Sequence, residues 1–380
     1  MTYLTSPTTP RRVVVISTGG TIASRWQGTG YAADAGGDEV LAGVAVPDGV
    51  IPEVVDLFNV NSSRMTSARQ LALLHAVHEA LADPEVAGVV ITHGTDTLEE
   101  SAFLLDLHHA DPRPVVFTGA QRPLDSADSD GPGNVYDALQ VAARVRDLGV
   151  LVAFDGIVHA ARGTVKTQTL AAHPFADPSA RLVGRLGFHR VDIARRPERP
   201  RPLPLPSAAR ALAAGEPVEL PRVDIVTHHS DADPLLLDAA VAAGARGIVL
   251  VATGTGNATP QFAESVAAAV TRGVLVAVTT RVHAGPVAEV YTGGGAVDLV
   301  AAGAVLTGTL RAGQARIAVL ATLLADTADT ADTADTADAA DAADTAETAD
   351  TAGVVPERRS ALLRHLLGAP ESRPESAPAA

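Results

Sequence analysis

Short apolar runs rich in β-branched residues alternate along the chain with longer stretches rich in Ala and Leu. Strands that are apolar at every position are typical of parallel sheets covered on both faces by helices. The predicted strands cover residues 13–17, 86–91, 114–118, 150–154, 223–227, 247–251 and 273–279. The predicted helices include residues 68–82, 133–148, 235–243 and 260–272. The pattern predicts an α/β protein with mainly parallel sheets.

A proline-rich segment, RRPERPRPLPLP at residues 195–206, interrupts this alternation. Such a segment is typical of an extended linker. We therefore predict two α/β domains: a larger N-terminal catalytic domain at residues 1–194 and a smaller C-terminal domain at residues 207–325. A helix and tail are expected at residues 353–380.

Residues 326–352 form a low-complexity acidic insertion in which a carboxylate falls at every third position from Asp326 to Asp350. A helix advances by about 100° per residue, so these side chains would spiral around it and mark no single face. We predict a solvated, mostly disordered loop. The alternative of a calcium-binding or partner-binding tail lacks the glycine turns and mixed oxygen ligands of calcium loops.

The charge of the chain argues against nucleic acid and anionic membranes as partners. The net charge is −15; without the nine acids of the insertion, 35 acids face 29 bases, an ordinary −6. The first apolar run is too short for a signal peptide, and no run of 18 apolar residues follows. We expect a soluble cytoplasmic protein. The absence of cysteine excludes disulfides and thiolate nucleophiles.

The basic residues are strongly biased, because 28 of the 29 are arginine and only Lys166 is lysine. Arginine keeps its proton in proteins, whereas a lysine can release it when burial and neighbours lower its pKa. Lys166 is therefore a candidate titrating group, although compositional chance would leave the same pattern.

Two predicted strands end in loops rich in glycine and hydroxyl groups. The first, STGGTIAS, presents Thr18 or Thr21 as a candidate nucleophile; a phosphate-binding turn and a purely structural turn are the alternatives. The second, THGTDTLEE, contains Asp96, which is either catalytic or a helix cap, and His93, which we interpret as structural. With Lys166 as base and Asp96 as orienter, a threonine nucleophile indicates acyl transfer without a metal or organic cofactor.

These loops, TVKTQT around Lys166, and the block VVFTGAQRPLDSADSDGPGNVYDAL resemble the bacterial-type L-asparaginases, including the asparaginase/glutaminase enzymes. The resemblance runs from about residue 12 to residue 325. The form S-S-x-M-T at Ser62 is more similar to the cytoplasmic type than to secreted members, which leaves the preference between asparagine and glutamine open.

The resemblance implies a site made of five catalytic residues. Thr21 would be the nucleophile and Tyr31 its assistant, while Thr95, Asp96 and Lys166 would orient water and move protons. Substrate would be held by Gly20, Ser62, Ser63, Gly94 and the backbone carbonyl of Ala120. Whether Tyr31, water or Lys166 activates Thr21 stays open.

The implied reaction converts L-asparagine to L-aspartate and ammonia, with minor glutaminase activity and no cofactor or metal. The implied assembly is a homo-oligomer, a tetramer or dimer, in which a neighbouring subunit completes each site through residues 253–259. Two alternatives are the asparaginase-like subunit of a tRNA-dependent amidotransferase and a non-catalytic amino-acid-binding protein of the same fold.

Overall fold

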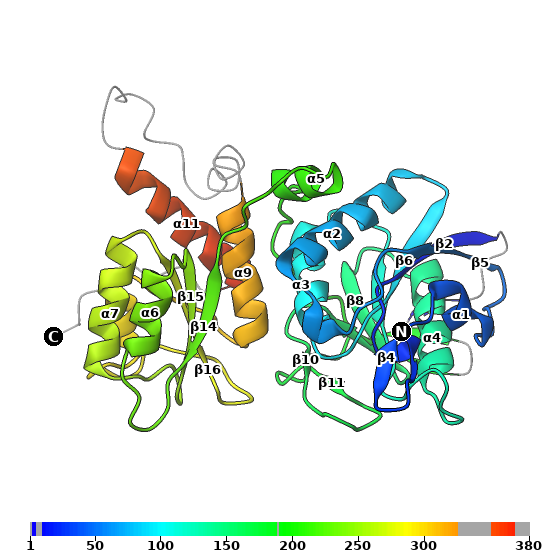
Figure 1. Cartoon of the computed structure of the whole chain (residues 1–380), viewed down its shortest axis with the longest axis horizontal. Coiled ribbons are helices and arrows are strands. Elements are labelled where there is room, and N and C mark those ends of the chain that lie inside the picture. The colour runs from blue at the N-terminus through cyan, green and yellow to red at the C-terminus, as the bar shows by residue number, and fades with distance from the viewer. Residues whose placement is uncertain (1, 5–9, 188–189, 326–350, 369–380) are drawn as a thin grey trace. The chain divides into compact units, whose positions relative to one another are not determined.

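The structure is a computed structural model and describes residues 2–4, 10–187, 190–325 and 351–368 (Figure 1). The chain divides into two compact units, Met1–Leu220 and Pro221–Ala380. The predicted insertion lies outside the described residues except for its last two, and so does the predicted tail from residue 369 on.

The first unit is built on one mixed sheet. Within the described residues its nine strands, in spatial order, are β1 (Thr2–Leu4), β13 (Arg190–Ile193), β12 (Gly184–Gly187), β9 (Ile157–Ala160), β8 (Val150–Phe154), β7 (Val115–Thr118), β6 (Val86–Thr92), β2 (Arg11–Ser17) and β5 (Val50–Asp56). The five strands from β8 to β5 are parallel, and the others are antiparallel. The prediction of mainly parallel sheets is therefore confirmed.

Helices cover both faces of this sheet, as its apolar strands require. Every residue of β6 is buried. The helices α2 (Ser67–Ala82) and α3 (Leu98–His108) lie on one face, and α1 (Gly37–Ala42) and α4 (Gly131–Arg144) lie on the other (Figure 1). Val135 and Leu139 of α4 pack against Val90 and Val116 of the sheet. The α4 helix ends earlier than its predicted residue 148 because the backbone is already extended at Val145.

Short elements at the ends of the parallel strands complete the first unit. They are the 3₁₀ turns η1 (Thr21–Ala23) and η2 (Ser62–Arg64), the hairpin of β3 (Ser24–Trp26) and β4 (Tyr31–Ala33), and the pair β10 (Val165–Lys166) and β11 (Phe175–Ala176).

The proline-rich segment at residues 195–206 is tied to the first unit. The backbone N–H of Leu203 donates to Leu107 O at 2.7 Å, and His108 Nδ1 donates to Pro204 O at 2.7 Å. The next helix, α5 (Ser207–Ala213), packs against α2. The division between the units therefore falls after α5, at Leu220, and not within the predicted linker.

In its described part the second unit holds four parallel strands in the order β14 (Val223–Thr227), β15 (Gly247–Ala252), β16 (Leu275–Thr280) and β17 (Val305–Leu306). Its helices are α6 (Leu235–Ala242), α7 (Pro260–Thr271), α8 (Ala296–Ala301), α9 (Ala312–Leu324) and α11 (Thr351–Leu367). The predicted C-terminal helix corresponds to α11, which packs on α9.

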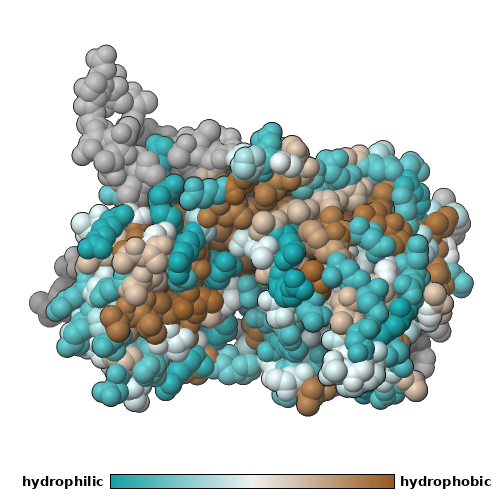
Figure 2. Space-filling model, in the orientation of Figure 1, coloured by the Kyte–Doolittle hydropathy of each residue, from teal (hydrophilic) through white to brown (hydrophobic). Residues whose placement is uncertain are grey.

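Apolar side chains gather at the surface over α6, where Leu235 and Leu236 are exposed by 66% and 65% (Figure 2). Across the described part of the chain, no helix is both long enough and apolar enough to cross a bilayer.

Candidate active site

Three loops at the carboxyl ends of adjacent strands meet at two glycines. Gly20 follows β2 and packs against Gly94, which follows β6; a Cβ at Gly20 would lie 2.3 Å from Gly94 Cα. Gly94 in turn packs on the loop after β5, since a Cβ there would lie 2.7 Å from Ser62 Oγ. Side chains at these two positions would push the loops apart, so the glycines allow the three loops to form one surface.

Hydrogen bonds fix the Ser62 loop to the loop after β6. Ser62 Oγ accepts the backbone N–H of Asp96 at 3.2 Å, and Thr97 Oγ1 donates to Ser62 O at 2.9 Å. Asp96 therefore lies in the loop that precedes α3, and its own backbone is held by a residue predicted to bind substrate.

The loops enclose a cavity of about 370 Å³. Eight of the ten predicted site residues line it: Gly20, Thr21, Tyr31, Ser62, Ser63, Gly94, Thr95 and Asp96. Ser24, Asn61, Gln121 and Pro123 complete the lining. The cavity lies where ligands bind in open α/β sheets, beyond the carboxyl ends of parallel strands.

Lys166 reaches this site from β10. Its Nζ donates to Thr95 Oγ1 and to Asp96 Oδ1, both at 2.7 Å. The Lys166 side chain is 16% exposed, whereas that of Asp96 is 65% exposed. The ammonium group thus lies behind the carboxylate, and Asp96 remains open to a ligand.

Thr21 and Tyr31 form another part of the cavity wall. Thr21 begins the η1 turn, and within the described residues no protein group hydrogen-bonds its hydroxyl. Tyr31 lies on the β3–β4 hairpin and packs edge to face on Trp26, with ring centroids 5.2 Å apart. By contrast Thr18, the other candidate nucleophile, is buried and donates to Thr92 O at 2.9 Å.

Ala120 does not line the cavity. It is fully buried in the core beneath α4, and its neighbour Gln121 occupies the wall. The resemblance assigns the backbone carbonyl of Ala120 to the substrate, but the motif after β7 does not report which of its residues reaches the cavity. Gln121 is therefore not identified from the sequence, although it directly follows Ala120 in the motif block, whereas Asn61 lies beside Ser62 in the loop that the resemblance assigns to the substrate.

Two buried titratable groups support the loops. Complete burial lowers the pKa of His93 to about 4, so the imidazole is neutral. Its Nδ1 donates to Gly94 O at 2.7 Å, and its Nε2 accepts from Ser101 Oγ at 3.0 Å. His93 thus has the structural role expected from the sequence. Glu99 accepts the backbone N–H of Lys166, and burial raises the pKa of its carboxyl to about 7.

Family models match both units. The model "Asparaginase, N-terminal" matches residues 12–199, and "Glutaminase/Asparaginase C-terminal domain" matches residues 222–336. The chain belongs to the asparaginase family. The resemblance carried by the motif loops is therefore confirmed.

Relatives in this family span most of the chain. A "Probable L-asparaginase" of Deinococcus radiodurans is 37% identical over 324 residues, which cover 83% of this chain and 94% of the relative. "L-asparaginase 2" of Escherichia coli is 32% identical over 314 residues, covering 80% and 86%. A crystal structure of a "Probable Cytoplasmic L-asparaginase" from Campylobacter jejuni superposes with a TM-score of 0.76 at 26% identity, covering 93% of this chain and 99% of that one.

Proposed function

We propose that this member of the asparaginase family hydrolyses L-asparagine to L-aspartate and ammonia. The observation that carries the proposal is the contact of Lys166 Nζ with both Thr95 Oγ1 and Asp96 Oδ1 beside a cavity that Thr21 also lines. The Thr21 hydroxyl, which has no hydrogen-bond partner among the described residues, and a lysine bound to a hydroxyl and a carboxylate fit acyl transfer from an amide.

In the proposed reaction, Thr21 Oγ attacks the amide carbon and its proton passes to the leaving ammonia. Gly94 and Thr95 line the cavity, and backbone N–H groups of this turn would stabilise the negative charge on the carbonyl oxygen. Water then attacks the acyl-threonine ester, which releases L-aspartate and restores the Thr21 hydroxyl. Thr95 and Lys166 orient this water, and its proton passes to the departing Thr21 oxygen.

Substrate recognition is assigned to the exposed carboxylate of Asp96 and to the Ser62 loop. Asp96 would bind the α-ammonium group by charge, and the hydroxyls of Ser62 and Ser63 would donate to the α-carboxylate. The relative rates on asparagine and glutamine test this assignment, since a longer side chain displaces the amide from Thr21.

The decisive experiment compares Thr21→Ala with Thr18→Val by ammonia release from L-asparagine. We expect Thr21→Ala to lose at least about 10³-fold in kcat. Thr18→Val should stay near wild type, because the backbone N–H of Thr18 also donates to Thr92 O. Full activity of Thr21→Ala would contradict the proposal. Wild-type protein that binds L-aspartate without releasing ammonia would identify an amino-acid-binding protein instead.

We also propose that the protein is cytoplasmic and forms a homo-oligomer, a tetramer or dimer. The exposed Leu235 and Leu236 of α6 offer a second copy an apolar contact. Light scattering of wild type and of Leu235→Glu tests this: a wild-type monomer would exclude the oligomer, and a variant of unchanged mass would place the interface elsewhere.

A further inference from the structure

The side-chain amide of Gln121 has one possible orientation. Its Nε2 lies 3.2 Å from Thr169 O and 3.1 Å from Ala171 O. Backbone carbonyl oxygens only accept hydrogen bonds, so the NH₂ group must face this loop. The amide oxygen Oε1 consequently faces the opposite way, toward Thr95.

This orientation determines where the hydroxyl proton of Thr95 points. Thr95 Oγ1 lies 3.2 Å from Gln121 Oε1 and 2.7 Å from Lys166 Nζ. The amide oxygen only accepts, and an ammonium group only donates. The single proton of the Thr95 hydroxyl is therefore directed to Gln121, and a lone pair of the hydroxyl oxygen faces Lys166.

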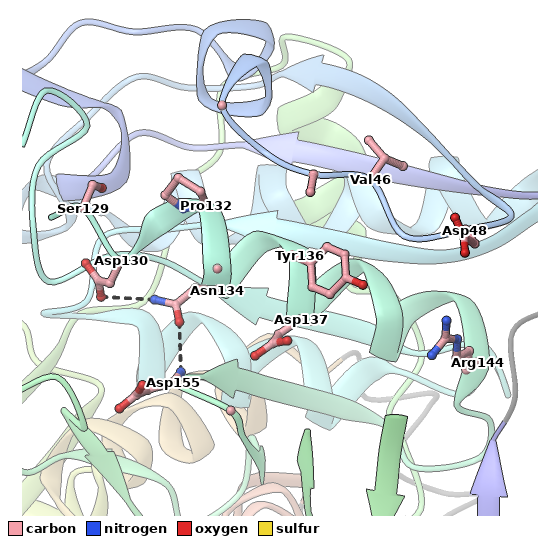
Figure 3. A pocket seen from close by; sticks show the side chains of 14 residues that line it. Val46, Asp48, Ser129, Asp130, Pro132, Asn134, Tyr136, Asp137, Arg144 and Asp155 are labelled. Atoms are coloured by element: carbon pink, nitrogen blue, oxygen red, sulfur yellow. Dashed lines mark hydrogen bonds between the residues drawn. The ribbon is translucent and has the colours of Figure 1, made fainter. Parts of the chain in front are cut away.

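The backbone of Gln121 is fixed independently of its side chain. The two carboxylate oxygens of Asp130 accept the N–H of Gln121, both at 3.0 Å, and Oδ1 also accepts the N–H of Arg122 at 2.8 Å. Asn134 Nδ2 donates to Asp130 at 3.1 Å, and Asn134 Oδ1 accepts the N–H of Asp155 at 2.9 Å (Figure 3). The start of α4 thus holds Gln121 in place.

We propose that Gln121 is a positioning residue for the amide hydrolysis. By accepting the hydrogen bond of the Thr95 hydroxyl, it leaves the lone pairs of the Thr95 oxygen to accept from Lys166 and from water in the cavity. The inference rests on the proposed function. A water that donates to Thr95 keeps its own lone pairs free to attack the acyl ester. The same amide ties Thr95 to residues 169–171, the loop that follows Lys166 along the chain.

Two variants separate this role from simple packing. Gln121→Met keeps the side-chain length and removes both the acceptor and the donors. We expect kcat on L-asparagine to fall about tenfold, the effect of a lost hydrogen bond, while KM changes less than threefold. Gln121→Glu keeps this position only while its carboxyl is protonated, because an ionised carboxylate cannot donate to Thr169 O or Ala171 O and is repelled by both. The ratio of its kcat to that of wild type should therefore rise as pH falls from 8 to 5, whereas the ratio for Gln121→Met stays flat.

A third measurement does not depend on activity. Because Lys166 is the only lysine, protein labelled with ¹³C-lysine gives a single Cε resonance. In Gln121→Met the freed Thr95 proton can turn toward a neutral amine, so the pH titration of this resonance should move to lower pH than in wild type. The control is Gln168→Met, an exposed glutamine in the same loop, which should match wild type in every measurement.

The outcomes are distinct. Gln121→Met with kcat within twofold of wild type, a flat ratio for Gln121→Glu, or an unmoved lysine titration would overturn the positioning role. A rise in KM alone would make Gln121 a substrate-binding residue instead. Wild-type protein without asparagine hydrolysis would refute the proposed function, and the lysine titration would still decide the orientation of Thr95. Where Gln121→Met fails to fold, the pH-dependent ratio of Gln121→Glu gives the answer.

Discussion

Lys166 and Asp96 form an ion pair of 2.7 Å between Nζ and Oδ1, although 70 positions separate them in the chain. The pair brings the only lysine of the protein to the loop that ends β6, next to Thr95. If only a positive charge were needed at this position, arginine would be expected there, because every other basic residue of the chain is arginine. The contact with a hydroxyl as well as a carboxylate supports the proposed role of Lys166 in proton movement.

Replacing this lysine with arginine tests that role. Lys166→Arg keeps the positive charge but removes a group that can release a proton. The planar guanidinium group also does not match the positions of Thr95 Oγ1 and Asp96 Oδ1, which accept from the ammonium group. We expect kcat/KM on L-asparagine to fall about 10²-fold or more, with the thermal midpoint of unfolding nearly unchanged. The control is the reverse exchange Arg210→Lys on α5, which should have no effect. Near-normal turnover of Lys166→Arg would mean that the lone lysine is a compositional accident.

The sequence predicted the loops of the site better than the residues that hold these loops in place. STGGTIAS and THGTDTLEE are contiguous motifs, and each follows a buried strand, so their convergence follows from adjacent parallel strands. Gln121 also lies in a motif block after a buried strand, but its partners Thr169 and Ala171 are about 50 positions away, so the sequence does not show what its side chain contacts. Periodicity reports which face of an element is apolar, and does not report which distant carbonyls a polar side chain meets.

The same limit explains two further differences between the predicted and the observed fold, which concern the antiparallel strands and the proline-rich segment. The antiparallel strands β12 and β13 are short and partly exposed, so they lack the continuous apolar signal of β6. The composition of the proline-rich segment predicts an extended linker, because it disfavours helices and strands. Its attachment depends on single groups, such as Leu203 and His108, that composition does not describe.

The close packing of Gly20 against Gly94 predicts a large cost for a methyl group. Gly20 and Gly28 have nearly the same positive φ, 89° and 87°, but a Cβ at Gly28 meets nothing within 4 Å. Gly28→Ala should therefore lower the free energy of unfolding by about 1 kcal/mol, the cost of the backbone conformation alone. Gly20→Ala adds a collision with backbone and should cost about 2–4 kcal/mol. Urea unfolding of both variants measures the difference; equal costs would show that the loops separate freely.

The attachment of the proline-rich segment depends on Arg199. Its Nε donates to Asp106 Oδ1 at 2.7 Å, and its Nη2 donates to Asp106 O at 2.9 Å and to His109 O at 2.7 Å. The Asp106 side chain is only 3% exposed, so Arg199→Ala leaves a buried carboxylate without its cation. We expect the free energy of unfolding to fall by about 3–5 kcal/mol. The exposed neighbour Arg201→Ala should change it by less than about 0.5 kcal/mol. A similar small effect at both positions would show that the segment contributes little to the first unit.

The carboxyl of Glu99, which accepts the backbone N–H of Lys166, makes stability depend on pH. Burial raises its pKa from 4.5 to about 7 in the folded protein. Between these values the folded protein holds a proton that the unfolded chain has lost, so the free energy of unfolding decreases as pH rises through this window. The loss of folding stability caused by the ionised Glu99 carboxyl is absent below about pH 4.5 and complete above about pH 7.

Glu99→Gln removes the titrating group and keeps an oxygen for the Lys166 N–H. Relative to wild type, the variant should gain stability between pH 5.5 and pH 8, by roughly 2 kcal/mol at most, because residual exposure of the carboxyl weakens the effect. Urea unfolding at the two pH values measures the gain. The matched control is Glu79→Gln on α2, whose carboxyl is exposed to water and should give the same difference at both. A difference for Glu99→Gln that does not grow with pH would mean that the Glu99 carboxyl stays ionised in the folded protein, beside the backbone of Lys166.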